Sequence, residues 1–155
     1  MFTLQRIFII AFIVLLEACT TTPRPNKNVV VDEKAVGDGQ IGGSSQTDAA
    51  ITSLFEQSQS QVTAGNLDEG ARVLERALRI EPANPQTWYR MAKIKYLQND
   101  YAQAAVTASR SNTFAGSDNA LRLLNLTLML DSYSALGDTD QAATVRAQID
   151  TIQQQ

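Results

Sequence analysis

The sequence predicts an all-α protein, a solenoid of about three helix-turn-helix repeats at the end of a flexible tether. Three observations lead to this fold class. From Ala49 onward, alanine, leucine, glutamine and charged residues alternate at helical spacing. An Asn or Asp followed three residues later by Glu or Gln recurs at three places, each behind a turn residue. The segment before Ala49 is rich in Thr, Pro, Gly and Ser instead, which is typical of a linker.

The N-terminus carries a short apolar run that ends close to the only cysteine of the chain. The run, Ile7 to Leu16, is wholly apolar and follows Arg6. As a helix it would extend about 15 Å, roughly half of a bilayer core, so it is too short to span a membrane. A basic residue before such a run is typical of a secretory signal, and we expect residues 1–18 to be a signal peptide.

The residues at the end of this run, Leu16-Glu17-Ala18-Cys19, resemble the lipobox of bacterial lipoproteins. An aliphatic residue stands three positions before the cysteine and a small residue directly before it, whereas Glu17 departs from the usual pattern. The resemblance implies that Cys19 becomes the mature N-terminus and carries acyl chains such as palmitate, which together anchor a protein stably. In that family the next residue influences sorting, and Thr20 implies the outer membrane, facing the periplasm. The alternative is an ordinary buried thiol in an uncleaved anchor.

Residues 19–48 are expected to form a disordered tether that starts at the acylated cysteine. Apolar residues are sparse there, so the segment cannot bury enough surface to offset the entropy lost on ordering. Flexible-chain statistics place its ends roughly 30 Å apart. The folded domain is then expected over residues 49–152, and residues 153–155 are expected to fray.

Three repeated stretches carry the same helix-start pattern. They are AGNLDEGARVLERAL at 64–78, QNDYAQAAVTASRSN at 98–112 and LGDTDQAATVRAQID at 136–150. In each, an Asx side chain can cap the first turn of a helix, and the Glu or Gln can reach back to it. The capping pairs are Asn66/Glu69, Asp100/Gln103 and Asp138/Gln141. The residues before them, Gly65, Asn99 and Gly137, are expected to have a positive φ.

The spacing and the residues of these units resemble the tetratricopeptide repeat. The turn residues lie 34 and then 38 positions apart, and 34 is the length of a tetratricopeptide unit. The stretch ALRIEPANPQTWYRMA at 77–92 is similar to a junction between two such units, with Asn84 as cap and Pro85 as first helical residue. Gly70 stands where the first unit would have alanine, and about four residues are extra around 113–121. The resemblance implies helix pairs that bury their apolar faces by stacking.

Within the stack we expect a core of large side chains and an outer face of ion pairs. Pairs at the i,i+4 spacing are expected on solvated helix faces, namely Asp68 with Arg72 and Glu75 with Arg79. The expected core residues are Leu54, Leu74, Leu78, Trp88, Met91 and Leu126.

Composition argues against catalysis, metal binding and nucleic-acid binding. The chain has no histidine and a single cysteine, which excludes Ser-His-Asp and Cys-His catalysis and a Cys/His zinc site. Its net charge of −3 disfavours contact with phosphate backbones. The sequence contains no glycine-rich phosphate loop and no nucleophile elbow. We therefore expect a binding protein without enzyme activity, cofactor or metal.

Two functions from different classes are consistent with these features. The resemblance to tetratricopeptide lipoproteins implies a membrane-anchored scaffold that binds a protein or peptide partner in cell-envelope assembly. The machinery could be that of a pilus or secretin, of outer-membrane proteins or of peptidoglycan. The alternative is an architectural, self-associating envelope lipoprotein without a peptide ligand. A monomeric, ligand-binding domain would favour the first function, and a concentration-dependent dimer would favour the second.

The resemblance also implies where a partner would bind. In this family the first helix of each unit lines a concave face, and in the first two units the corresponding residues share the spacing i, i+4, i+7 of one helix face. Carried onto this chain, those positions include Phe55, Gln59, Val62, Tyr89, Arg90, Lys93, Tyr96, Leu124, Leu128 and Asp131.

The expected groove is aromatic and apolar, with a positive patch at Arg90 and Lys93. Such a surface suits a helix or an extended segment that carries aliphatic anchors. Chaperone-binding members of the family hold a terminal carboxylate with lysine and asparagine, where this chain has Phe55 and Gln59, so that clamp is not expected. The alternative for Tyr96, Leu124 and Leu128 is that they pack within the solenoid.

Replacing Cys19 with alanine tests the predicted anchor. Because no acyl chain can attach without the thiol, we expect an uncleaved precursor or release of the protein from the envelope. Fractionation and mass spectrometry of the mature N-terminus measure this. Wild-type protein whose mature N-terminus has an unmodified Cys19, or lacks it, would contradict lipidation.

Overall fold

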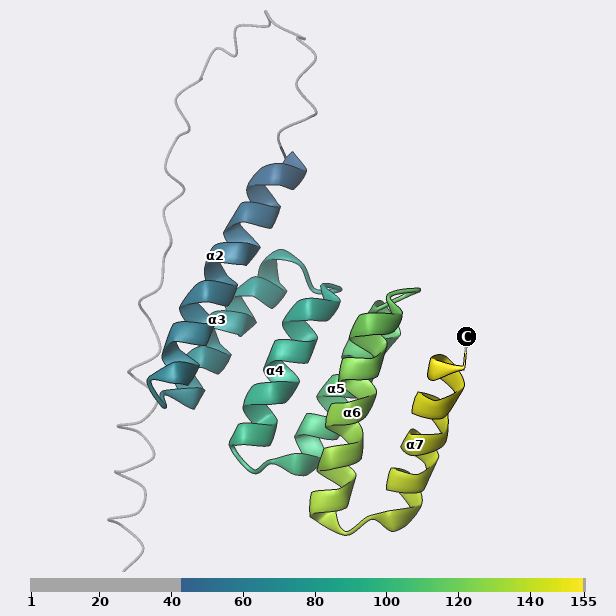
Figure 1. Cartoon of the computed structure of the whole chain (residues 1–155). Coiled ribbons are helices and arrows are strands. Elements are labelled where there is room, and N and C mark those ends of the chain that lie inside the picture. The colour runs from purple at the N-terminus through teal and green to yellow at the C-terminus, as the bar shows by residue number, and fades with distance from the viewer. Residues whose placement is uncertain (1–42, 155) are drawn as a thin grey trace, which may run out of the picture. The chain divides into compact units, whose positions relative to one another are not determined.

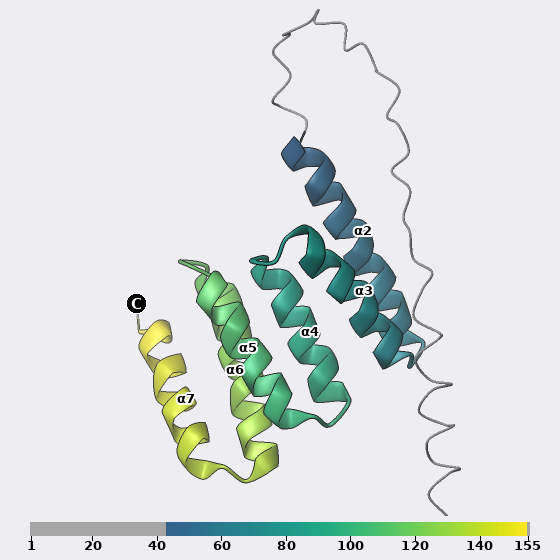
Figure 2. The ribbon, with the colours of Figure 1, turned by 180° about the vertical axis from the view of Figure 1, so that it is seen from behind.

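A computed structural model of the chain describes residues 43–154, and these residues form six α-helices. They are α2 (Gly43–Thr63), α3 (Leu67–Ile80), α4 (Pro85–Leu97), α5 (Tyr101–Phe114), α6 (Asn119–Leu136) and α7 (Thr139–Gln153). Each helix packs on the next one along the chain, and α4 also packs on α6. Consecutive helices run antiparallel (Figures 1 and 2). The predicted all-α stack of three helix pairs is therefore confirmed.

The folded part begins earlier than the sequence predicted. Helix α2 starts at Gly43, so residues 43–48 are helical, whereas the prediction assigned them to the tether. Within this stretch, the side chains of residues 45–48 are mostly exposed. A helix that already has a packed portion can extend without apolar residues because propagation is far easier than nucleation. The predicted signal peptide, Cys19 and the rest of the predicted tether lie outside the described residues.

The predicted turn and cap residues mostly take their predicted roles. Gly65, Asn99 and Gly137 have φ values of 82°, 60° and 74°, so each turn uses the left-handed conformation. Asp100 and Asp138 accept a hydrogen bond from the backbone N–H three residues on, at 3.3 and 3.1 Å. These caps fix where α5 and α7 begin.

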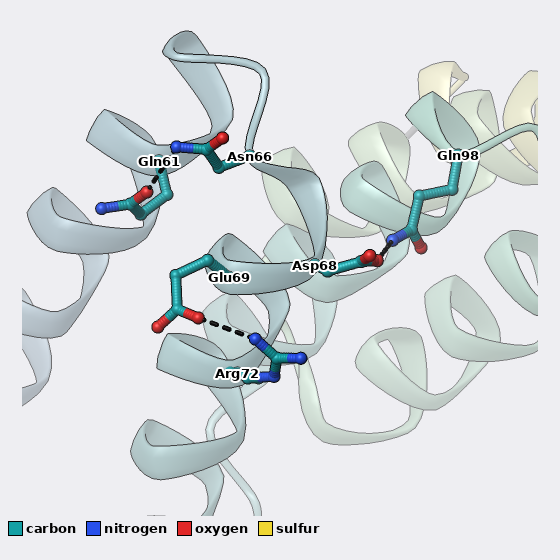
Figure 3. A network of polar contacts seen from close by, with 6 residues as sticks. All are labelled: Gln61, Asn66, Asp68, Glu69, Arg72 and Gln98. Atoms are coloured by element: carbon teal, nitrogen blue, oxygen red, sulfur yellow. Dashed lines mark hydrogen bonds and ion pairs between the residues drawn. The ribbon is translucent and has the colours of Figure 1, made fainter.

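The prediction that the Asn66 side chain caps α3 is wrong. This side chain makes no capping hydrogen bond, and its Nδ2 donates instead to Gln61 Oε1 at 3.0 Å (Figure 3). The turn between α2 and α3 is tight enough to bring these two amides together. The side chain therefore joins the end of α2 to the start of α3 rather than capping α3.

One of the two predicted ion pairs, Asp68 with Arg72, is also wrong. Arg72 pairs with Glu69 at 2.9 Å rather than with Asp68 (Figure 3). Asp68 Oδ1 accepts a hydrogen bond of 2.7 Å from Gln98 Nε2, which joins the start of α3 to the end of α4. Sequence spacing could not predict this contact because Gln98 is 30 residues away. Both members of the ion pair are exposed, so it adds little stability.

The apolar core consists of three clusters that follow the order of the helices. One joins α2 to α3, a second joins α3 to α4, and a third includes residues of α4, α5, α6 and α7. Among the described residues, no helix combines the length and hydropathy needed to cross a bilayer. The predicted core residues that are buried are Leu54, Leu74, Met91 and Leu126.

Two further predicted core residues, Leu78 and Trp88, are only half-buried. The indole Nε1 of Trp88 donates to the carbonyl oxygen of Pro82 at 2.8 Å, and the Arg110 guanidinium lies 4.3 Å from a ring centroid. Trp88 therefore ties the turn between α3 and α4 to α5. An indole has a polar edge, which needs a hydrogen-bond acceptor that an apolar core does not supply.

A buried polar chain that joins the second and third helix pairs was not predicted. Asn125, fully buried on α6, donates from Nδ2 to Ser111 Oγ at 2.8 Å. Ser111 in turn donates to the carbonyl oxygen of Pro85 at 2.8 Å. The chain links α4, α5 and α6 through groups that would otherwise be buried without partners.

Two leucines on α6 test the core assignment. Leu126 is 1% exposed, so Leu126→Ala should lower the free energy of unfolding by about 2–5 kcal/mol, as cavity-forming substitutions do. Leu124 is 48% exposed and serves as the matched control, with an expected loss of about 0.5 kcal/mol or less. Urea denaturation measures both values. Equal losses would show that the core is assigned wrongly.

Candidate functional site

The side chains of α2 and α4 line two neighbouring hollows, which together we call the α2–α4 groove. The first hollow has a volume of about 380 Å³ and the second about 460 Å³, within the range of ligand pockets. Gln59 and Arg90 line both. The first hollow is lined by Ser58, Gln59, Val62, Gln86, Tyr89, Arg90, Lys93, Ile94 and Leu97. The second is lined by Thr52, Phe55, Glu56, Gln59 and Arg90.

The first hollow lies where α2, α3 and α4 meet at Gly70. Ser58 Oγ on α2 donates to the carbonyl oxygen of Gly70 at 2.9 Å, and this bond is buried. A Cβ on Gly70 would lie 3.0 Å from Val62 Cγ2 and 3.4 Å from Ile94 Cδ1. The missing side chain therefore lets α2 and α4 approach α3 closely, and places Ser58, Val62 and Ile94 side by side in the hollow.

Arg90 connects α4 to α2 between the two hollows. Its guanidinium carbon lies 4.5 Å from the centroid of the Phe55 ring, a cation–π distance. Its Nε is buried and has no hydrogen-bond partner among the described residues. Lys93 lies one turn further along α4, with its Nζ 5.8 Å from the centroid of the Tyr89 ring. Both cations are thus held over aromatic faces.

The first hollow is positively charged. Arg90 and Lys93 are the charged residues that line it, and no described carboxylate forms an ion pair with either of them. The second hollow differs because Glu56 lines it together with Arg90. Burial raises the pKa of the Tyr89 hydroxyl above its ordinary value, and the nearby charge of Arg90 offsets part of that rise. The phenol therefore stays protonated at neutral pH and can donate a hydrogen bond.

The structure brings together six of the ten residues predicted for the partner-binding face. The six that line the α2–α4 groove are Phe55, Gln59, Val62, Tyr89, Arg90 and Lys93. That they bind a partner stays a prediction.

The other four predicted residues line neither hollow, and one of them, Asp131, is exposed. The Tyr96 ring packs edge-on against Tyr101, with centroids 5.2 Å apart. Leu128 is partly buried against the cluster that includes α6 and α7 residues, and Leu124 is exposed. The alternative for Tyr96, Leu124 and Leu128 is that they pack within the stack. The contacts of Tyr96 and Leu128 agree with this alternative, whereas the exposure of Leu124 does not.

The sequence did not point to several lining residues. Gln86 and Leu97 lie on the same face of α4 as Tyr89 and Lys93, and helical periodicity could have found them. Ser58 and Ile94 are buried residues that line the hollow close to Gly70, a contact between helices that no local pattern reveals. Among the described residues, no group of three or more His, Cys, Asp or Glu side chains could hold a metal ion.

Comparison with known proteins identifies the repeat. A family model described as the tetratricopeptide repeat matches residues 61–124, which include all of α3, α4 and α5. The solved structure of the globular C-terminal domain of P. aeruginosa LpoP is similar, with 33% sequence identity and a TM-score of 0.64. That similarity covers 66% of this chain and 97% of the LpoP domain. No curated protein sequence matches the chain significantly.

The environment of Tyr89 gives a prediction for alkaline pH. The difference in ultraviolet absorbance between wild type and Tyr89→Phe should show a phenol that ionises above 10.0, the ordinary value. Arg90→Gln should move that ionisation to still higher pH, because a favourable charge is removed. A midpoint below the ordinary value, or one unmoved by Arg90→Gln, would contradict the placement of these two side chains.

The same shift determines how Tyr89 affects stability. Because folding raises its pKa, the native state binds the proton more tightly than the unfolded chain does. The stabilising contribution of Tyr89 to the free energy of unfolding is therefore fully present below the pKa of this phenol in the unfolded chain. It is lost as pH rises through the pKa of the phenol in the folded protein. Urea midpoints should fall less steeply in that alkaline range for Tyr89→Phe than for wild type.

Proposed function

Because the chain belongs to the tetratricopeptide-repeat family, we propose that it is a membrane-anchored scaffold that binds a protein of the cell envelope in the α2–α4 groove. Tetratricopeptide repeats are protein-interaction domains, and this one acts by binding rather than by catalysis. The observation that carries the proposal is the groove itself. It joins two concave hollows and half-exposed apolar side chains on one face of neighbouring helices. It also holds two cations that form no ion pair within residues 43–154.

The membrane anchor in this proposal is Cys19, acylated after removal of residues 1–18. Acyl chains at Cys19 would hold the protein in the outer membrane, facing the periplasm. The chain between Cys19 and α2 would then keep the helices near that membrane. The similarity to the LpoP domain supports an envelope lipoprotein.

Among the machineries that the sequence leaves open, we put peptidoglycan synthesis first, with a synthase as the partner. The likeness to LpoP favours it over the pilus or secretin and over outer-membrane protein assembly. A scaffold of this kind would contribute contact surface to the synthase, while the synthase performs the chemistry.

Capture from an envelope extract by the acylated protein tests this function. Tyr89→Ala combined with Lys93→Ala removes an aromatic surface and a charge from the groove, so retention of the partner should fall at least about tenfold. Gln141→Ala combined with Arg146→Ala, at exposed positions of α7, is the matched control and should retain it fully. Both variants should keep the wild-type circular dichroism. A folded groove variant that captures the partner at wild-type strength would rule out the groove as the site.

A further inference from the structure

We propose that the first hollow of the α2–α4 groove recognises an acidic side chain of the partner, Asp or Glu, next to an aliphatic one. The inference rests on the proposed function and specifies the chemistry of the partner segment. It differs from recognition of a chain terminus, because the carboxylate belongs to a side chain within the segment.

The charge of the hollow is the first argument. Arg90 and Lys93 give it two positive charges, and no carboxylate lines it or pairs with them among the described residues. The chain as a whole has a net charge of −3, so this hollow stands out against an acidic background. Unpaired cations in a concave, partly desolvated site attract an anion more strongly than surface cations do, because the local dielectric is lower.

The fixed position of Arg90 is the second argument. Its guanidinium is held over the Phe55 ring at 4.5 Å, so little side-chain entropy remains to be lost on binding. Its Nε is buried without an acceptor, and no carboxylate in the described part of the chain pairs with the guanidinium. A planar guanidinium held in this way can bind a carboxylate through its terminal N–H groups. The protonated Tyr89 hydroxyl and the Gln59 and Gln86 amides supply further donors around the same hollow.

The apolar part of the hollow is the third argument. Val62, Ile94 and Leu97 line it beside the two cations, and Leu97 leaves 49% of its surface exposed. Ile94 is itself buried, so an aliphatic side chain that covers Val62 and Leu97 would remove their exposed apolar surface from water. Because cations and apolar groups line the same hollow, a segment with adjacent acidic and aliphatic residues matches it better than either residue alone.

The second hollow favours one orientation of the bound partner segment. Glu56 lines it, so an acidic side chain placed there would meet a like charge. The acid is therefore favoured in the first hollow and disfavoured in the second. A penalty of this kind selects one orientation of the segment over the reverse one.

Two capped peptides test the proposal against full-length protein with labelled methyl groups in detergent micelles. The probes are acetyl-Leu-Glu-amide and acetyl-Leu-Gln-amide, which differ only in the charge and lack terminal charges. Nuclear magnetic resonance titration should move the methyl signals of Val62, Ile94 and Leu97. The Glu peptide should bind at least about tenfold more tightly, as expected for a charged hydrogen bond. Added salt should reduce this preference.

Variants assign the preference to the two cations. Lys93→Gln should weaken it, and Arg90→Gln combined with Lys93→Gln should abolish it, whereas Arg146→Gln on α7 should leave it unchanged. Equal binding of the two peptides in the groove would overturn the acidic preference but leave the groove as a binding site. Peptides that move no groove methyl would also overturn it. Capture of the envelope partner by wild type but not by the groove variant would still support the proposed function.

Discussion

The close approach of three helices at Gly70 is the constraint on which the groove depends. Ser58 hydrogen-bonds to the backbone of Gly70, and Val62 and Ile94 lie against the space that a Cβ would fill. The alanine usual at this position of the family would press against Val62 and touch Ile94. The family fold brings α2 and α4 to the same side of α3, and this substitution sets how closely they approach.

The stacking of the helices determines which side chains each helix buries and which it leaves exposed. The buried faces of α4, α5, α6 and α7 share one cluster, and a polar chain through Asn125 links three of these helices. Helix α7 buries Val145 and Ile152 and exposes mainly Thr, Gln, Ala and charged residues, so its outer face is well solvated. The groove over α2 and α4 is different, because it combines aromatic rings, half-exposed aliphatic groups and two cations that no described carboxylate pairs with.

Local signals predicted the fold well, and contacts between helices were harder to predict. The left-handed turn at Gly137 and the cap at Asp138 depend on neighbouring residues only, so sequence spacing could locate them. The contact of Asp68 with Gln98 joins residues of different repeats, so local spacing could not predict it. Half of the groove residues lie at positions that the family resemblance implied. Ser58 and Ile94 were missed because they line the hollow near Gly70, where helices distant in local sequence meet, and the sequence showed Gly70 only as a departure from the family pattern.

The most direct test of the central claim, that the partner occupies the α2–α4 groove, is photocrosslinking in living cells. p-Benzoylphenylalanine is introduced singly at Gln59 or Gln86 in the groove, and at Ser109 or Arg146 on exposed faces of α5 and α7. The full-length acylated protein should form one specific adduct from each groove position and none from the other two. Adducts that form only from Ser109 or Arg146 would contradict the claim.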